Sequence, residues 1–149
     1  MKYMGGKAKI AKHILSIILA DRKHNQYYVE PFCGGLGTMD KVMGLRIAAD
    51  SNKYLIAMWQ ALQLGWIPPQ IIEKDFYDQV RTSTRNNTSE FPDYIKGYIG
   101  FNGSYCGRFF DGGYAGITKT KTDYVRNYPL EAWNSVMEAV PKIKGIQFR

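Results

Sequence analysis

The order of its short apolar runs predicts that this chain folds as an α/β domain on a small parallel sheet. Residues 27–29 and 45–49 are apolar runs of strand length, and each ends next to an acidic residue. Between them, residues 39–43 mark the start of a helix, and residues 52–64 repeat apolar positions at helical spacing. A strand–loop–helix–strand order joins strands that run the same way, so we expect a parallel sheet, with residues 143–148 as its third strand.

Apolar residues at helical spacing predict the remaining helices. These cover residues 8–19, 71–81 and 94–101, and a last helix begins at Pro129 and stops at Pro141. The polar residues 82–90 are predicted to form a loop. Residues 103–127 mix glycines with aromatic and basic residues and show no clear period, so they predict no regular element.

The composition indicates one soluble domain that attracts polyanions. The chain has 149 residues, of which 45% are hydrophobic, enough for one core. Its net charge is +7, and nucleic acid is the commonest polyanion in a cell. No apolar run reaches the length of a membrane span, and the apolar start reads as a helix, not a secretory signal. Cys33 and Cys106 lack zinc spacing, so we expect no metal site and a reducing, cytoplasmic setting.

The stretch YYVEPFCGGLG, residues 27–37, raises the question of what approaches its glycines so closely. A strand that ends in a glycine turn offers free backbone N–H groups and room for a ligand. Glu30 ends this strand, and Asp50 ends the next, where a carboxylate can accept hydrogen bonds from a ribose diol. These features favour an adenosine-type ligand. A tight turn without a ligand, and a helix-capping role for Asp50, are the alternatives.

The stretch KYMGGK, residues 2–7, places an aromatic ring and a cation on a glycine turn ahead of the first helix. Tyr3 can stack on an adenine and Lys7 can hold a carboxylate. The alternative is an unordered start with a solvated pair of lysines.

Together, KYMGGK, YVEPFCGG, AADSNKYLI and GYIGFNGSYCGRFFDGGYAG resemble, in this order, the DNA adenine-N6 methyltransferases of the Dam type. The resemblance spans essentially the whole chain and implies a partial Rossmann-like, S-adenosylmethionine-dependent methyltransferase fold with strands in the order 3-2-1. Residues 1–66 and 129–149 are its cofactor-binding α/β part, and residues 67–128 are a mostly helical target-recognition insertion. The implied cofactor is S-adenosylmethionine, and the implied partner is double-stranded DNA.

The resemblance also assigns roles to particular residues. Those implied to contact S-adenosylmethionine are Tyr3, Lys7, Glu30, Pro31, Phe32, Gly34 and Asp50. Asn102, Ser104, Tyr105 and Arg108 match the family's recognition pattern and are the implied DNA contacts. Lys119, Lys121 and Arg126 are predicted to hold phosphates, with a solvated basic loop as the alternative. One departure is Leu36, which stands where the family often has the second glycine of Phe-x-Gly-x-Gly, so the loop path is expected to differ locally.

The family's catalytic motif, Asp-Pro-Pro-Tyr at the end of the fourth strand, does not occur in residues 1–149. We therefore expect no catalytic residue here and no methylation by the chain alone. Under this interpretation it is the N-terminal portion of an enzyme: a deliberate fragment, a truncated gene product or half of a split enzyme. The first strand becomes an exposed apolar edge, so we expect a complementing C-terminal half, a homo-oligomer or local rearrangement.

Two other functions remain open at this point. One is a non-catalytic DNA- or cofactor-binding module derived from such an enzyme. The other is a nucleotide-binding α/β protein of a different class.

Overall fold

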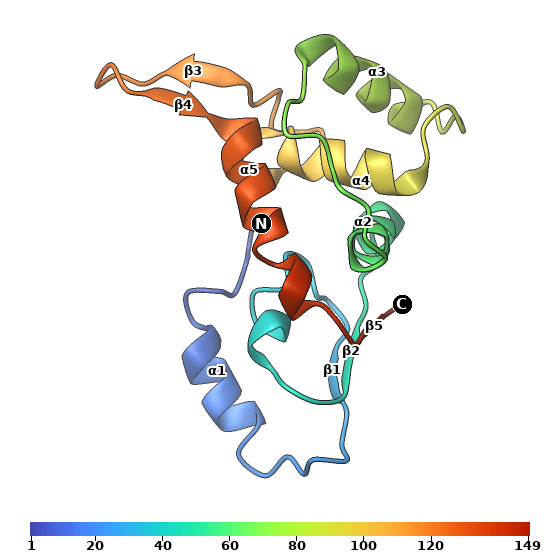
Figure 1. Cartoon of the computed structure of the whole chain (residues 1–149), viewed down its shortest axis with the longest axis vertical. Coiled ribbons are helices and arrows are strands. Elements are labelled where there is room, and N and C mark those ends of the chain that lie inside the picture. Colours follow the sequence, from blue (N-terminus) through green and yellow to red (C-terminus); the bar gives the residue numbers. More distant parts are fainter.

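The computed structural model describes residues 1–149 and has a sheet region and a helical region, which lie at opposite ends of the view in Figure 1. The sheet region also carries α1 (Ala11–Ile18). The helical region holds α3 (Lys74–Arg85), α4 (Asp93–Asn102) and the hairpin of β3 (Ile117–Lys119) and β4 (Val125–Asn127). Helices α2 (Lys53–Gln63) and α5 (Tyr128–Met137) run between the two regions.

The sheet has three parallel strands in the order β1-β2-β5. They are β1 (Tyr28–Glu30), β2 (Arg46–Ala48) and β5 (Ile146–Phe148). Val29 pairs with Ile47, and Ile47 pairs with Gln147. The predicted α/β architecture with a small parallel sheet is confirmed. Strand β1 has only β2 as a neighbour, so its other edge is open.

Helix α2 connects the sheet to the helical region. Its first turn is capped by Asn52, whose side-chain oxygen accepts hydrogen bonds from the N–H groups of Tyr54 and Leu55, both at 3.1 Å. Helix α4 crosses α2 so closely that a Cβ atom on Gly97 would lie 2.0 Å from the carbonyl oxygen of Tyr54. Trp59 of α2 is fully buried and donates its indole N–H to the carbonyl of Gly34 at 3.1 Å. The glycine loop is therefore tied to the core through α2.

Two predictions of local structure in the middle of the chain are wrong. Part of the predicted loop 82–90 is helical, since α3 continues to Arg85. The polar side chains fit there because Thr84 donates its hydroxyl to the carbonyl of Val80 at 2.7 Å, one turn earlier. Residues 117–127 form an antiparallel hairpin that the sequence pattern did not predict. Its β3 strand is exposed throughout, so no alternation of buried and exposed residues marks it.

Several predicted elements are shorter than their sequence patterns. Residues 39–43 contain only a single 3-10 turn, Met39–Lys41, and the third strand begins at Ile146. Gly145 precedes that strand at φ 76°, in a left-handed turn that cannot continue a strand. None of the helices combines the length and hydropathy needed to cross a membrane. The structure also contains no cluster of His, Cys, Asp and Glu side chains suited to a metal ion.

Candidate functional site

The chain's own N-terminus packs against the glycine loop. A Cβ atom on Gly34 would lie 2.7 Å from Tyr3 Cε1, and one on Gly35 would lie 2.8 Å from Tyr3 Cβ. A Cβ atom on Gly37 would meet the backbone nitrogen of Ala8 at 2.8 Å. These separations are shorter than normal contacts, so side chains at these glycines would displace the N-terminal segment. The close approach that the glycines permit is, in this structure, the approach of residues 3–8.

Leu36 keeps a glycine-like backbone in spite of its side chain. Its φ is 61°, in the left-handed region that glycine adopts without strain. For other residues this conformation costs roughly 1–2 kcal/mol. The Leu36 side chain is 1% exposed and belongs to the hydrophobic core, and its burial offsets that cost.

Asp50 links the end of β2 to the glycine loop. Its Oδ2 accepts the N–H of Gly34 at 3.0 Å, and its Oδ1 accepts the N–H of Asn52 at 3.0 Å. The cap of α2 is Asn52, so Asp50 does not act as the helix cap that was one alternative. A carboxylate has about four lone-pair sites. Two are used here, which leaves acceptor capacity for the hydroxyl groups of a ligand.

Lys7 and Glu30 form the second polar part of the site. The ammonium of Lys7 lies 3.3 Å from Glu30 Oε1, and the Thr38 hydroxyl donates to Glu30 Oε2 at 2.7 Å. Lys7 also approaches the carbonyl oxygen of Phe32 at 3.4 Å. Glu30 is buried, so these two partners fix the orientation of its carboxylate at the end of β1.

A cavity of about 780 Å³ opens between α1 and the free edge of β1. Lys7, Glu30, Pro31 and Phe32 line one end of it, and apolar residues such as Ile14 line the rest. This volume is within the roughly 300–1,000 Å³ of small-molecule sites. The cavity is thus large enough for an S-adenosylmethionine-sized ligand and offers a cation, a carboxylate and an aromatic ring.

The seven predicted cofactor residues do not share one cavity. Four line the cavity beside β1, whereas Tyr3 lines a second cavity of about 530 Å³ together with Phe101, Phe109 and Arg108. Gly34 and Asp50 line neither cavity and are joined to each other by the hydrogen bond from the Gly34 N–H to Asp50 Oδ2. The Tyr3 ring meets Phe101 of α4 with ring centroids 5.5 Å apart. The N-terminal motif therefore contacts both the glycine loop and α4.

Two of the predicted DNA contacts lie inside the protein. Asn102 and Ser104 are each 4% exposed. The Asn102 amide donates to the carbonyl of Tyr98 at 3.2 Å. The Ser104 hydroxyl lies 2.9 Å from the Tyr77 hydroxyl and accepts the N–H of Phe110 at 3.1 Å. Ser104 therefore links the loop after α4 to α3, while the Asn102 amide bonds within α4, and both side chains are buried in this structure.

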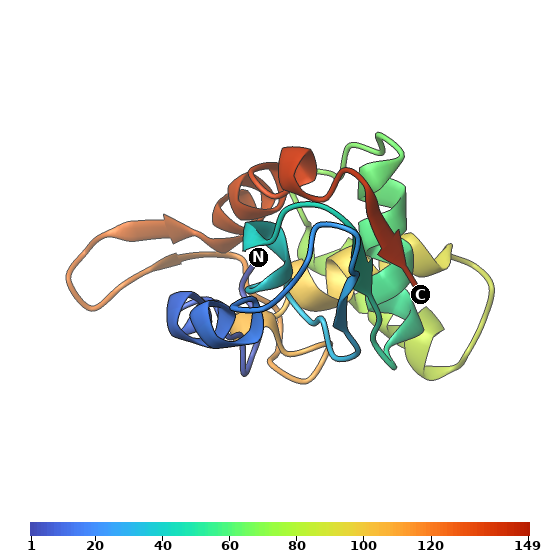
Figure 2. The same cartoon turned by 90° about the horizontal axis from the view of Figure 1, so that it is seen from below.

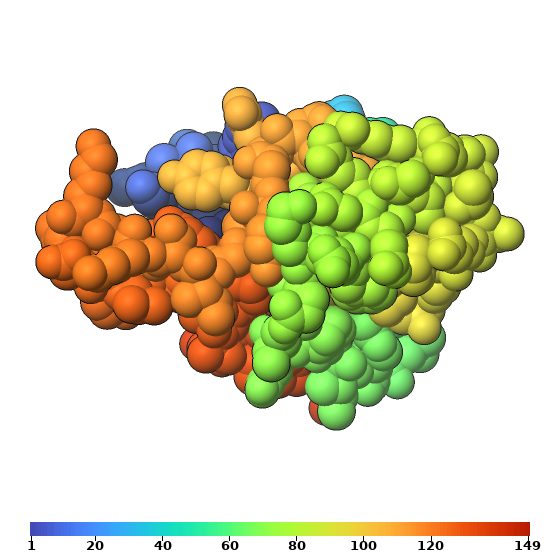
Figure 3. Space-filling view, turned by 90° about the horizontal axis from the view of Figure 1, so that it is seen from above, coloured from blue at the N-terminus to red at the C-terminus, as the bar shows by residue number.

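The remaining predicted DNA contacts are at the surface, and they differ in whether an acidic side chain already binds them. Tyr105 and Arg108 are exposed, and Lys121 has no acidic partner. Lys119 makes a 2.8 Å ion pair with Asp123 between largely exposed side chains, which contributes little to stability. Figure 3 shows that the hairpin carrying Lys119 and Lys121 projects from the body of the molecule.

Arg126 is engaged by an acidic residue that the sequence did not point to. Its Nε donates to Glu131 Oε1 at 2.9 Å, and Lys2 donates to Glu131 Oε2 at 2.9 Å. The Arg126 guanidinium holds the pKa of Glu131 at about 2, well below its usual value. Glu131 follows Arg126 by five residues across the start of α5, a separation for which no local pairing rule exists.

Residues 3–142 match the family described as D12 class N6 adenine-specific DNA methyltransferase. The chain belongs to this family. The resemblance predicted from four short motifs is thereby confirmed, and a search among curated proteins gave no match. The matched range of this D12 class methyltransferase chain includes most of the N-terminal motif, the glycine loop and the predicted recognition segment. The structure also shows two contacts of predicted site residues that the motifs did not indicate, Thr38 with Glu30 and Glu131 with Arg126.

Proposed function

We propose that residues 1–149 supply the S-adenosylmethionine-binding and DNA-contacting portion of an adenine-N6 DNA methyltransferase. The observation that carries this proposal is the arrangement around the glycine loop. Asp50 and Glu30 stand at the carboxyl ends of two adjacent parallel strands, and Lys7 and Tyr3 reach the same loop from the N-terminus. Ligands of open α/β sheets bind at this edge.

The chemistry of these side chains fits S-adenosylmethionine. The Lys7 ammonium suits the carboxylate of the methionine part, and the Glu30 carboxylate suits its ammonium group. The free acceptor sites of Asp50 suit the ribose diol, and the exposed ring of Phe32 or that of Tyr3 suits the adenine. When bound, the cofactor supplies an electrophilic methyl group. Thr38 keeps the Glu30 carboxylate oriented toward Lys7.

DNA binding is assigned to the exposed part of the recognition segment. Arg108 and Lys121 have no acidic partner, and the exposed pair of Lys119 with Asp123 can exchange for a phosphate at little cost. Tyr105 is about half exposed and offers an aromatic face for stacking on a base. Arg126 becomes available only when it leaves Glu131.

Methyl transfer requires more than a bound donor. The adenine amino nitrogen has to be desolvated and held in line with the methyl group, and such positioning is worth roughly 7–11 kcal/mol of the barrier. Residues 1–149 contain no Asp-Pro-Pro-Tyr. We assign the acid and the aromatic residue of the acceptor site to a polypeptide segment outside these residues, and we expect that segment to sit at the open edge of β1.

Tritiated methyl transfer to unmethylated DNA tests this proposal. The purified chain is assayed alone and then with a polypeptide that carries an Asp-Pro-Pro-Tyr half. We expect no incorporation by the chain alone and restored incorporation by the mixture. Robust turnover by the chain alone would contradict the proposal, and Asp111→Ala and Tyr114→Phe would then locate the acceptor site. Binding of DNA and cofactor without transfer in either assay favours a non-catalytic module.

A further inference from the structure

Positive charge is concentrated near the N-terminus. Residues 1–24 contain six Lys or Arg residues and one acidic residue, Asp21, whereas residues 25–149 contain 14 and 12. Five of the seven net positive charges therefore belong to the first 24 residues. The predicted recognition segment is not where most of the excess charge lies.

Helix α1 turns a polar stripe toward solvent. Its residues Ala11 and Leu15 are buried, and Ile14 and Ile18 line the cavity beside β1. On the opposite side, the exposed residues Lys9, Lys12, His13 and Ser16 follow one another with the i, i+3, i+4, i+7 spacing of one helical face, with Lys9 in the turn before the helix. We call these four residues the α1 stripe.

The two lysines of the α1 stripe are free of acidic partners. Other basic side chains nearby are already engaged: Lys2 binds Glu131 and Lys7 binds Glu30. Neither Lys9 nor Lys12 takes part in any of the eight ion pairs of the structure. A phosphate bound by these two ammonium groups would not have to displace an internal carboxylate, in contrast to one bound by Arg126.

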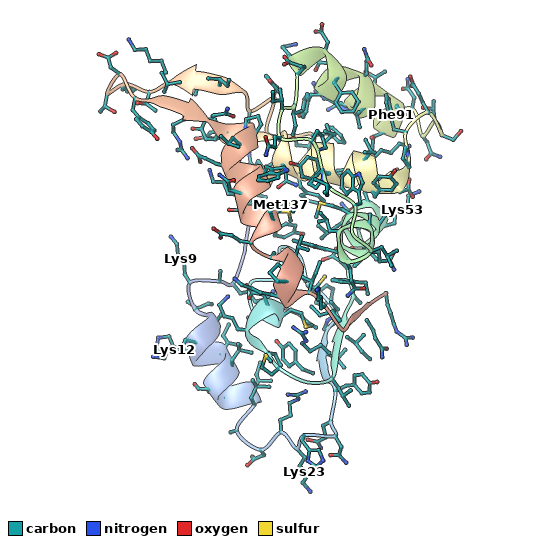
Figure 4. The ribbon with its side chains drawn as sticks, in the orientation of Figure 1. Lys9, Lys12, Lys23, Lys53, Phe91 and Met137 are labelled. Atoms are coloured by element: carbon teal, nitrogen blue, oxygen red, sulfur yellow. The ribbon has the colours of Figure 1, made fainter.

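The α1 stripe lies on the side of the molecule toward which the hairpin projects. In Figure 1 and in Figure 2, turned by 90°, both α1 and the β3–β4 hairpin lie at the left of the molecule. Figure 4 shows that Lys9 and Lys12 point away from the body on this side. One extended polyanion can therefore meet both elements without contacting the opposite side of the protein.

We propose that the α1 stripe is a second contact surface for the DNA backbone, in which Lys9 and Lys12 bind phosphates of the duplex that the hairpin engages. The inference rests on the proposed DNA-binding function and extends it to an element outside the recognition segment. Ammonium groups on flexible stems hold phosphates without reading bases. The stripe thus contributes affinity that is the same for all DNA sequences, while recognition stays with the segment around Tyr105 and Arg108.

A double substitution with a charge-matched control tests the inference. Lys9→Gln with Lys12→Gln is compared with Lys142→Gln with Lys144→Gln, because these four lysines are all exposed and without acidic partners. Duplex affinity is measured by fluorescence anisotropy between about 50 and 200 mM salt. The loss of two phosphate contacts should make the negative slope of log K against log salt shallower by about 1.8. The control pair should leave the slope near that of the wild type.

The slopes of the two double variants distinguish a contact at the α1 stripe from an effect of net charge. Equal slope losses in both variants would show that only net charge matters and would overturn the inference, as would an unchanged slope in the α1 variant. If the wild type binds no DNA, this inference and the proposed DNA-binding function both fail.

Binding to vesicles that contain phosphatidylserine is measured as a second experiment. If the α1 variant loses vesicle binding but keeps the wild-type slope on DNA, the stripe is a membrane contact and the inference is wrong. Melting curves check that both variants are folded.

Discussion

Tyr3 packs its ring so closely on Gly34 that a Cβ atom on Gly34 would lie 2.7 Å from Tyr3 Cε1. The same ring meets Phe101 of α4 at a centroid distance of 5.5 Å. The N-terminal motif therefore connects the loop that follows β1 with α4, part of the predicted recognition segment. A ligand that displaces or orders Tyr3 would act on both at once.

Substitution of Gly34 tests the contact with Tyr3. Gly34 and Gly113 both have positive φ, 47° and 72°, but a Cβ atom on Gly113 meets nothing within 4 Å. We expect Gly113→Ala to lower the free energy of unfolding by about 1–2 kcal/mol through backbone strain alone. Gly34→Ala should cost about 1–3 kcal/mol more, because Tyr3 has to move. Urea unfolding measures both, and equal losses would mean that the Tyr3 contact contributes nothing.

Release of Arg126 should strengthen DNA binding. Glu131→Gln removes the carboxylate that holds Arg126 and Lys2. A freed Arg126 that binds a phosphate should steepen the slope of log K against log salt by about 0.9 on duplex DNA. Glu138→Gln is the matched control, because Glu138 is exposed and takes part in no ion pair. An equal gain in both variants would attribute the effect to net charge, not to Arg126.

The two cysteines should differ in reactivity. Cys33 is buried, and burial raises the pKa of its thiol to about 12, while Cys106 is exposed. At pH 8 iodoacetamide should therefore modify Cys106 only, and both cysteines should react in denaturant. Mass spectrometry of the modified chain identifies which cysteine carries the label. Labelling of Cys33 at the rate of Cys106 in the native protein would show that the loop opens readily.

Because burial raises the pKa of the Cys33 thiol, the free energy of unfolding should decrease at high pH. The folded-state pKa of Cys33 lies above its ordinary value of 9.0, so the folded state retains the thiol proton where the unfolded chain loses it. The stabilisation is complete below about pH 9 and is lost as the pH rises toward 12. Cys33→Ser should flatten this part of the stability profile relative to the wild type. A profile that keeps its full slope in the variant would assign the dependence to other groups.

The parts of the fold that the sequence predicted are those set by local pattern. The strands at residues 28–30 and 46–48 and the helix after Asn52 follow from apolar periodicity and a capping side chain. The β3–β4 hairpin was not predicted because its side chains are exposed or only partly buried. Its strands therefore show no alternation of apolar and polar residues. Its turn also contains Asp123 at φ 60°, where glycine is the usual residue.

The candidate site was predictable in its motifs but not in its contacts. The resemblance located the glycine loop and Asp50, yet it placed Asn102 and Ser104 at the DNA interface, whereas both are buried. Ser104 contacts Tyr77 and Phe110, and Asn102 contacts Met58 of α2, and these partners meet only after folding. The pairing of Glu131 with Lys2 spans 129 positions in sequence, and no local rule reveals such a contact.

Titration calorimetry with S-adenosylhomocysteine tests whether the glycine loop and its neighbours bind the cofactor. We expect saturable binding of one ligand per chain. Asp50→Asn and Lys7→Gln should each weaken it at least about tenfold, equivalent to about 1.4 kcal/mol. Asp75→Asn, an exposed acid of α3 without an ion pair, should bind as the wild type does. No saturable binding by the wild type, or wild-type affinity in both site variants, would contradict the assignment of this loop as the cofactor site.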